Sequence, residues 1–332
     1  MRIGYLGAGT WGFCLALQLA RNGHEVFIWD NNPAHIERLR EYREHPNLPG
    51  YKAPSNIRFV SRIEDVLKDI DFLVESVTAA GIRPVFLKLK ELNISSIPIV
   101  LTSKGIDQQY GLLLPELVEL ILGESYRNKI VCLSGPSHAE EVILQHPTSV
   151  VCAGNDKELM KIVRDAFSTK EFRIYFNSDV RGVSFGGAVK NVVAIACGVS
   201  DGLGFGDNTK AALMTRGLHE IRKLSVAIGC NSQTLTGLSG IGDLCVTCLS
   251  GLSRNYQFGQ LLAQGFSPKE SQDKIVVVVE GAYTSRSVHD LGRKNDLDLP
   301  IIEAVYNMIY HELEPKDAVQ HLLSRPPREE RL

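Results

Sequence analysis

Short runs of apolar residues, many of them β-branched, alternate in the first half of the chain with longer stretches whose apolar positions recur at the helical period. The short runs show no polar alternation, so each predicted strand is buried on both faces. Such strands form a parallel sheet that helices cover on both sides. The predicted strands comprise residues 2–6, 25–29, 57–60, 71–75, 97–101, 129–133, 150–153 and 173–176.

After about residue 180 the strand pattern almost ends and helical patterns take over. A chain of 332 residues is long enough for two domains. We therefore predict a sheet-containing, cofactor-binding domain at residues 1–179 and a mostly α-helical, substrate-binding domain at residues 180–332. The predicted helices of the second domain comprise residues 183–199, 209–228, 254–264, 282–294 and 301–310.

Composition excludes several classes of protein. With 44% hydrophobic and 22% charged residues the chain is globular rather than disordered. Its 36 basic and 38 acidic side chains lack the positive surplus of a nucleic-acid-binding protein. No secretory signal pattern and no uncharged run of about 18–20 residues is present, so we expect a cytoplasmic protein without membrane insertion. The seven scattered cysteines predict reduced thiols, and Cys245-x-x-Cys248 lacks the further ligands of a metal site.

A glycine motif follows the first predicted strand directly. Gly7-Ala8-Gly9-Thr10-Trp11-Gly12 is a complete G-x-G-x-x-G between a strand and a helix. Gly7 permits the tight turn, Gly9 lets the backbone approach a pyrophosphate, and Gly12 lets the helix pack closely on the strand. The helix N-terminus offers its free N–H groups to the anion. The motif predicts a Rossmann-type, doubly wound α/β domain that binds a dinucleotide; the alternative is a glycine turn without a ligand.

Asp30 ends the second predicted strand, where an acid accepts hydrogen bonds from the adenosine ribose. Its charge would repel a 2′-phosphate, and the following Asn31 and Asn32 provide no arginine to neutralise one. Asp30 and Asn31 are therefore candidate cofactor-binding residues that favour NAD(H) over NADP(H). In the alternative interpretation, Asp30 only caps the next helix.

Lys190 lies in an apolar, small-residue-rich segment, residues 185–196, that predicts a buried helix. Burial disfavours the charged ammonium and would lower its pKa toward neutrality. Such a lysine is suited to exchange a proton with an alcohol or carbonyl oxygen. Alternatively, its side chain extends to the surface and keeps the ammonium in water.

Polar residues at four predicted loops complete the candidate site. Lys104 follows the strand at residues 97–101, at the edge of the sheet where ligands bind, or is a solvated loop lysine. Residues 134–141 follow the next strand, and Ser137 there can cap a helix. Asp243 ends a glycine-rich segment. Ser253-Arg254-Asn255 begins a predicted helix, where a guanidinium and helix-terminal donors can bind a phosphate, unless Arg254 is an ordinary surface arginine.

Together these motifs resemble the bacterial-type NAD(P)-dependent glycerol-3-phosphate dehydrogenase family, from the glycine loop to about Tyr310. Six matches occur in order along the chain and are more specific than a glycine motif alone. They are Gly-Pro-Ser-x-Ala-x-Glu-Val at 135–142, Lys-Asn-Val at 190–192, Asp-Gly-Leu-Gly-Phe-Gly-Asp-Asn at 201–208, Gly-Ile-Gly-Asp-Leu at 240–244, Leu-Ser-Arg-Asn at 252–255 and Val-Val-Glu-Gly at 278–281.

The resemblance implies reduction of dihydroxyacetone phosphate to sn-glycerol 3-phosphate for glycerophospholipid synthesis, and a homodimer. It implies that Lys190 exchanges the proton and that Lys104 contacts both substrate and cofactor. The further substrate-binding residues it implies are Gly135, Ser137, Asp243, Ser253, Arg254 and Asn255. The further dinucleotide contacts it implies are Thr10, Trp11, Ala139, Arg254, Val278 and Glu280.

The chain departs from the family pattern at two places. His138 stands where the family often has an aromatic residue, and Asn31 and Asn32 stand where a basic residue often follows the second strand. The second departure weakens any prediction of NADP(H). Two other functions remain open: a dehydrogenase of hydroxy acids or sugar acids, and a sensor that binds NAD(H) without turnover.

Overall fold

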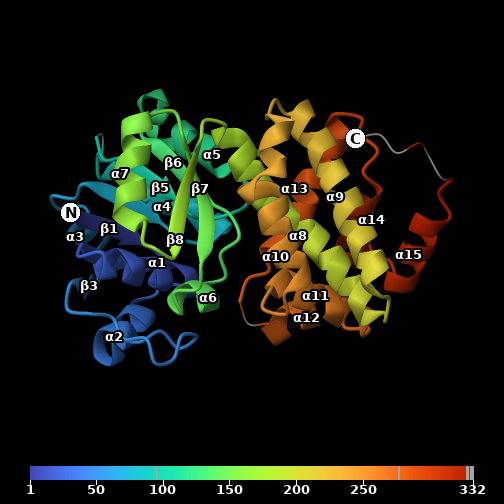
Figure 1. Ribbon diagram of the computed structural model, residues 1–332, viewed down its shortest axis with the longest axis horizontal. Helices are drawn as coiled ribbons and strands as arrows, with labels where there is room; N and C mark the ends of the chain where they lie inside the picture. The colour runs from blue at the N-terminus through green and yellow to red at the C-terminus, as the bar shows by residue number, and fades with distance from the viewer. Residues whose placement is uncertain (95, 276, 327–328, 330–332) are drawn as a thin grey trace. The chain divides into compact units, whose positions relative to one another are not determined.

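The computed structural model describes residues 1–94, 96–275, 277–326 and 329. The chain divides into two compact units (Figure 1). The first comprises Met1–Lys104 and Leu112–Ser184, and the second comprises Gly105–Gly111 and Phe185–Leu332. This division falls five residues after the predicted boundary at 179 and also assigns residues 105–111 to the second unit, which no sequence pattern indicated.

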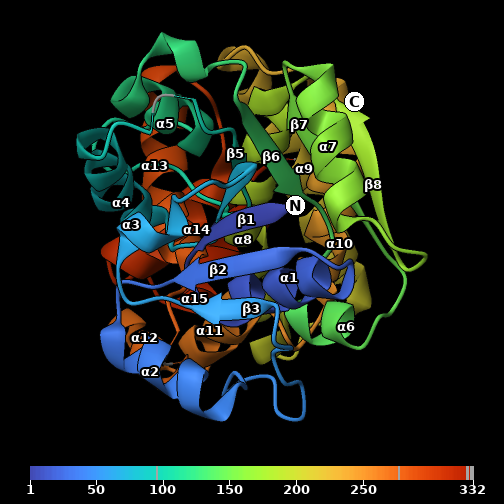
Figure 2. The same ribbon diagram turned by 90° about the vertical axis from the view of Figure 1, so that its left-hand side faces the viewer.

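The first unit contains one eight-stranded sheet in the order β3-β2-β1-β4-β5-β6-β7-β8 (Figure 2). All eight predicted strands are confirmed, with bounds that shift by at most two residues. β1 to β6 are parallel, whereas β7 runs antiparallel to β6, and β8 is parallel to β7. The sheet is therefore mixed at one edge rather than wholly parallel. The strands are β1 (Arg2–Leu6), β2 (Glu25–Trp29), β3 (Ile57–Phe59), β4 (Phe72–Glu75), β5 (Ile99–Leu101), β6 (Ile130–Ser134), β7 (Thr148–Gly154) and β8 (Phe172–Asn177).

Helices cover both faces of this sheet, as the unbroken apolar strands predict. Phe72 and Leu73 are neighbours on β4 and belong to separate buried clusters, one on each face. Helices α1 and α7 contribute to the cluster of Phe72, and α4 and α5 contribute to the cluster of Leu73 (Figure 2). The helices of this unit are α1 (Thr10–Arg21), α2 (Pro33–Tyr42), α3 (Ile63–Val66), α4 (Ala79–Glu91), α5 (Leu114–Leu122), η1 (Glu124–Tyr126), α6 (Ala139–Ile143) and α7 (Lys157–Phe167).

The order of the strands reverses at β1. From β1 the chain proceeds to one side through β2 and β3, and it returns to the other side of β1 at β4. In such sheets ligands bind at the carboxyl ends of the strands beside this reversal. The glycine loop follows β1 at this point, and Glu75 ends β4 beside it.

In the described residues the second unit contains helices and no strand, which confirms the predicted fold class of a Rossmann-type domain followed by a helical one. The apolar window of α8 is 89% buried. By length and composition this helix could cross a membrane, but its burial is that of a core helix. The helices are α8 (Val180–Gly202, which begins in the first unit), α9 (Asp207–Ala227), η2 (Ser232–Thr236), the π-helical turn η3 (Leu238–Gly242), α10 (Asp243–Leu249), α11 (Arg254–Ala263), α12 (Pro268–Ile275), α13 (Glu280–Lys294), α14 (Pro300–Tyr310) and α15 (Pro315–Leu323).

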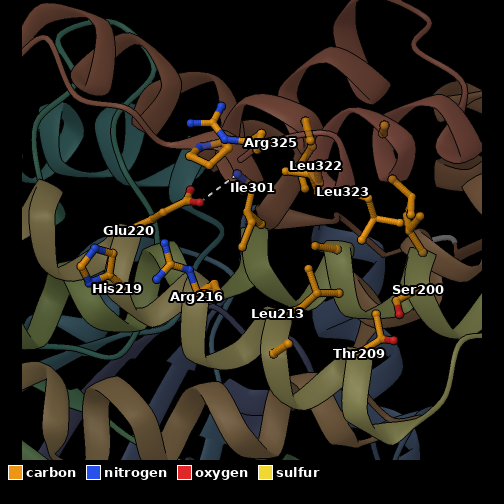
Figure 3. A pocket seen from close by; sticks show the side chains of 18 of the residues that line it. Ser200, Thr209, Leu213, Arg216, His219, Glu220, Ile301, Leu322, Leu323 and Arg325 are labelled. Carbon is orange, nitrogen blue, oxygen red and sulfur yellow. Dashed lines mark hydrogen bonds between the residues drawn. The ribbon is translucent and has the colours of Figure 1, made fainter. Parts of the chain in front are cut away.

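A cavity of about 990 Å³ lies among α8, α9, α14 and α15 (Figure 3). Its lining includes none of the predicted substrate-binding or cofactor-binding residues. Glu220 of α9 forms part of the wall and is 3% exposed. Its Oε1 and Oε2 accept hydrogen bonds from the backbone N–H groups of Ile301 (2.9 Å) and Ile302 (3.1 Å). This carboxyl group therefore caps the N-terminus of α14, where the first N–H groups of a helix lack internal partners.

Replacing Glu220 with Ala leaves two buried N–H groups of α14 without their acceptor. We expect the free energy of unfolding to fall by about 1–3 kcal/mol, measured by chemical denaturation. Glu303→Ala is the matched control, because Glu303 lies on the exposed face of the same helix. An equal loss in both variants would contradict the capping role.

Burial raises the pKa of Glu220 to about 7, against the lowering effect of the hydrogen bonds from Ile301 and Ile302. An acid whose pKa is higher in the folded state favours the folded state at low pH and loses that advantage as the pH rises. Stability of the wild type relative to Glu220→Gln should therefore fall between about pH 4.5 and 7. Parallel curves of unfolding free energy against pH for the two proteins would count against this.

Candidate active site

The glycine loop has the geometry that a pyrophosphate requires. Gly7 has φ 95°, and a Cβ there would lie 2.6 Å from the carbonyl oxygen of Ser76. A Cβ on Gly12 would lie 2.2 Å from the carbonyl oxygen of Gly7, so only glycine lets α1 pack this closely. At Gly9 the Cβ position has no atom within 4 Å, and no side chain caps the N-terminus of α1. The loop thus leaves its backbone amides and open space for an anionic ligand.

Asp30 holds the glycine loop and does not cap a helix. Its Oδ2 accepts a hydrogen bond from the N–H of Ala8 (2.8 Å), and its Oδ1 accepts one from the N–H of Asn32 (2.9 Å). The cap of α2 is Asn32, whose side chain accepts from the N–H of His35 (3.3 Å). The alternative interpretation of Asp30 as the cap is therefore wrong. Each carboxylate oxygen keeps acceptor capacity for a ribose hydroxyl.

Two further residues secure the same loop, and sequence reasoning missed both. The His35 ring Nε2 lies 2.9 Å from the carbonyl oxygen of Ala8. The side-chain amide of Asn47 donates to Thr10 Oγ1 (3.0 Å). His45 packs edge-on against the ring of His35, and burial lowers the pKa of His45 to about 4. The only sequence signal for these contacts was the long proline-containing loop after α2, which shows no pattern of its own.

The carbonyl group of Gly135 connects Lys104 and Ser137. The oxygen of Gly135 accepts from Lys104 Nζ (3.1 Å) and from Ser137 Oγ (3.0 Å). Lys104 is thus partly buried and hydrogen-bonded, not a fully solvated loop lysine. The expected capping role of Ser137 is wrong, because its hydroxyl turns back to Gly135 and the cap position of α6 is His138, whose side chain makes no capping hydrogen bond. Ala139 begins α6, and its carbonyl accepts from the Cys14 thiol.

In the second unit, Lys190 is buried and paired. Its residue is 6% exposed, so the alternative of an ammonium extended to the surface is wrong. Lys190 Nζ donates to Asp243 Oδ1 and to Thr247 Oγ1 (2.7 Å). Asp243 is 1% exposed, and it is the first residue of α10, so Thr247 lies one turn further along the same helix. A carboxylate and a hydroxyl from α10 therefore face the ammonium from α8.

The pairing of Lys190 changes its electrostatic interpretation. A buried ammonium without a counter-ion is strongly unfavourable, but an adjacent carboxylate compensates its charge. The expectation that burial alone lowers the pKa of Lys190 stays a prediction. What the geometry provides is a buried ammonium that donates hydrogen bonds to two side-chain oxygens.

The N-termini of α11 and α13 meet beside this pair. Ser253 caps α11 by accepting from the N–H of Tyr256 (3.3 Å), which leaves Arg254 exposed in the first turn. Asn255 Oδ1 accepts from the N–H of Gly281 (2.9 Å). A Cβ on Gly281 would lie 2.8 Å from the carbonyl oxygen of Asn191, which follows Lys190.

These contacts place several predicted residues near one another within the second unit. Glu280 begins α13 beside the bond from Gly281, and Val278 is exposed just before this helix. Asn255 Oδ1 is engaged by the N–H of Gly281, which fixes the orientation of the amide and leaves its Nδ2 donors pointing the other way. In the described part of the chain, no cluster of three or more His, Cys, Asp or Glu side chains could hold a metal ion.

Comparison with known proteins matches both halves of the chain to one family. Residues 2–160 match the family model described as NAD-dependent glycerol-3-phosphate dehydrogenase N-terminus, and residues 179–320 match the corresponding C-terminus. Glycerol-3-phosphate dehydrogenase [NAD(P)+] of Protochlamydia amoebophila is 51% identical over 331 residues, which span 100% of this chain and 99% of that protein. The protein of the same name from Chlamydia trachomatis serovar L2b is 48% identical over 99% of both chains.

A solved structure agrees with this assignment. The crystal structure of glycerol-3-phosphate dehydrogenase from Coxiella burnetii superposes with a TM-score of 0.93 at 36% identity, over 98% of this chain and 99% of that one. The match therefore extends through both units and not only through the widespread dinucleotide-binding fold. The chain belongs to the family of NAD(P)-dependent glycerol-3-phosphate dehydrogenases and is an oxidoreductase.

Proposed function

We propose that this chain reduces dihydroxyacetone phosphate to sn-glycerol 3-phosphate, with Lys190 as the proton donor and NAD(H) as the preferred cofactor. The observation that carries the proposal is the buried cluster of Lys190, Asp243 and Thr247. When bound, the nicotinamide supplies the hydride. The protein must then supply a proton to the carbonyl oxygen of the substrate, a receptor for its phosphate and a site with little water.

Lys190 performs the proton transfer. Its ammonium donates a proton to the substrate oxygen as negative charge develops there, which is general acid catalysis. Asp243 and Thr247 hold Nζ in one orientation and stabilise the charged form between turnovers. In line with the family pattern, Lys104 contributes a further positive charge, which stabilises the transition state more than the ground state. In the reverse direction Lys190 accepts the proton.

Arg254 binds the phosphate of the substrate. A guanidinium can contact two phosphate oxygens at once, and Arg254 stands at a helix N-terminus, where the helix dipole also favours an anion. Asn255 and Ser253 flank it in the same turn. In line with the family pattern, Gly135 and Ser137 also take part in substrate binding.

Asp30 supports NAD(H) over NADP(H). Its carboxylate is held at the end of β2 by two backbone N–H groups, so it cannot easily turn away from a ribose. A 2′-phosphate at this position would face a fixed negative charge, and Asn31 offers no compensating cation. The family resemblance further supports a role in glycerophospholipid synthesis, a cytoplasmic location and a homodimer.

A sensor that binds NAD(H) without turnover is the competing function. Such a sensor has no need of a buried lysine with a matched carboxylate, which favours the enzyme. Loss of NADH absorbance with dihydroxyacetone phosphate supports the enzyme, and binding without turnover supports the sensor. A preference for a hydroxy acid over glycerol 3-phosphate in the oxidative direction would instead support the other dehydrogenase class.

Replacing Lys190 with Ala should lower kcat by about 10²- to 10⁴-fold, the usual contribution of general acid catalysis, while NADH still binds. Because Lys190→Ala leaves Asp243 buried without its partner, Lys190→Arg is the second variant. Arginine keeps the positive charge but does not release its proton near neutral pH, so turnover should stay low in a folded protein. Lys316→Ala, at an exposed position of α15, is the control. Near-normal turnover in Lys190→Arg would remove Lys190 from the chemistry.

Replacing Arg254 with Ala should chiefly raise the KM for dihydroxyacetone phosphate. Hydrogen bonds to charged groups contribute roughly 1.5–3 kcal/mol, so the increase should be about 10- to 150-fold. Steady-state kinetics with each substrate varied in turn measures the effect. An unchanged KM for dihydroxyacetone phosphate would place the phosphate receptor elsewhere.

The cofactor preference is measured by comparing kcat/KM for NADH and NADPH. We expect NADH to be favoured by at least about tenfold, which corresponds to 1.4 kcal/mol. Asn31→Arg should narrow this ratio, because a guanidinium there can neutralise a 2′-phosphate. Equal use of both cofactors by the wild type would contradict the role of Asp30.

A further inference from the structure

Glu75 is a fully buried acid at the carboxyl end of β4, a central strand of the sheet. The glycine loop and Lys104 follow the neighbouring strands at the same end of the sheet. Glu75 lies opposite Leu6 of β1 and Leu101 of β5. Its exposed fraction is 0%. Neither the motifs nor the family resemblance drew attention to this residue, because in the sequence it only ends an apolar strand.

Glu75 is hydrogen-bonded to the segment that leads into Lys104. Its Oε1 lies 2.6 Å from Ser103 Oγ, within hydrogen-bond distance, and accepts from the N–H of Val77 (2.5 Å). Its carbonyl oxygen accepts from the N–H (3.0 Å) and the Oγ1 (2.8 Å) of Thr102. The residue therefore fixes, through both side chain and backbone, the two residues that precede Lys104.

Ser103 has a single hydroxyl hydrogen, and the contacts of this hydroxyl favour one protonation state of Glu75. Ser103 Oγ also lies within hydrogen-bond distance of the carbonyl oxygen of Val77. A hydroxyl has one hydrogen and cannot donate to both Val77 and Glu75. If Glu75 is a neutral acid, its own O–H donates to Ser103 Oγ, and Ser103 then donates to Val77. If Glu75 is ionised, two of these oxygens face each other without a hydrogen between them.

The surroundings of Glu75 also favour the neutral acid. Glu75 Oε2 is buried and has no hydrogen-bond partner, which is costly for half of a charged carboxylate. Burial raises the pKa of Glu75 to about 8, although hydrogen bonds from Ser103 and from the backbone of Val77 and Thr102 lower it. Among the described residues, no cation forms an ion pair with Glu75.

The titratable groups that face Glu75 do not neutralise a negative charge. Tyr5 from β1 and Cys132 from β6 both interact with it, and burial raises the pKa of each well above neutrality. Both are therefore uncharged near pH 7. From the segment after β5 it faces the hydroxyls of Thr102 and Ser103, while the Lys104 ammonium is bonded to Gly135.

We propose that Glu75, in its neutral form, is a positioning residue that holds the Ser103–Lys104 segment and so keeps the Lys104 ammonium at the carbonyl oxygen of Gly135. This inference rests on the role proposed above for Lys104. Ionisation of Glu75 draws the single Ser103 hydrogen to the carboxylate, so the carbonyl oxygen of Val77 loses its donor and the segment is held differently. Activity should then fall as the pH rises through about 8.

The test combines Glu75→Ala, Glu75→Gln and Lys104→Ala. We expect Glu75→Ala to lower kcat/KM for dihydroxyacetone phosphate by about tenfold or more, and Glu75→Gln to restore most of it, because the amide is neutral and can donate to Ser103. In a Lys104→Ala background, Glu75→Ala should cause little further loss, because two residues that act through one contact are not additive. Glu91→Ala, at an exposed position of α4, is the control.

The pH profile provides a readout that a merely structural role would not change. The fall in wild-type kcat/KM between pH 7 and 9 should be absent or shifted in Glu75→Gln. The proposal is overturned if kcat/KM falls identically at alkaline pH in both proteins. It is also overturned if Glu75→Ala has the same effect on kcat/KM with and without Lys104. If Glu75→Ala does not fold, the profile of Glu75→Gln decides.

Melting temperatures separate this inference from the proposed function. A raised pKa in the folded state means that the wild type loses stability relative to Glu75→Gln as the pH rises from about 4.5 to 8. If this difference is present but the wild type does not oxidise NADH with dihydroxyacetone phosphate, the proposed function fails and the neutral state of Glu75 stands. If turnover is present and the difference is absent, the inference about Glu75 fails alone.

Discussion

The buried ion pair of Lys190 and Asp243 is the constraint on which the chemistry of the second unit depends. An ammonium inside an apolar helix such as α8 is tolerated only with a counter-ion and further hydrogen bonds, and α10 supplies both through Asp243 and Thr247. Such a pair adds little net stability, but removing one partner is costly. The proposed proton donor and the fold of this unit are therefore coupled.

The first unit also contains a buried ionisable group, Glu75, but no opposite charge compensates it. Glu75 is as deeply buried as Lys190, yet its neighbours are hydroxyls, amides, a tyrosine and a thiol. Burial therefore favours the neutral acid, which can act as both donor and acceptor. Glu220 is a third case, because two helix-terminal N–H groups compensate its burial. Each of these three buried ionisable groups has a compensation that matches its chemistry.

Sequence patterns were sufficient for features that depend on neighbouring residues. The strands were predictable because apolar, β-branched runs of this length have few other stable conformations. The direction of a strand and the choice of a hydrogen-bond partner were not predictable in the same way. The antiparallel turn into β7 depends on the pairing of β6 with β7, and Ser137 bonds to Gly135 rather than to the helix after it. Both outcomes depend on competition between partners that the periodicity does not describe.

By itself the sequence determined the eight strands, the glycine loop and the apolar helix that carries Lys190, because backbone conformation and local apolar composition depend on adjacent residues. Only the tertiary structure decided the partners. Asp243 is 53 residues from Lys190, and Gly135 is 31 residues from Lys104. The packing of helices and strands determines which of many polar groups come within hydrogen-bond distance, and residue spacing along the chain carries no record of that choice.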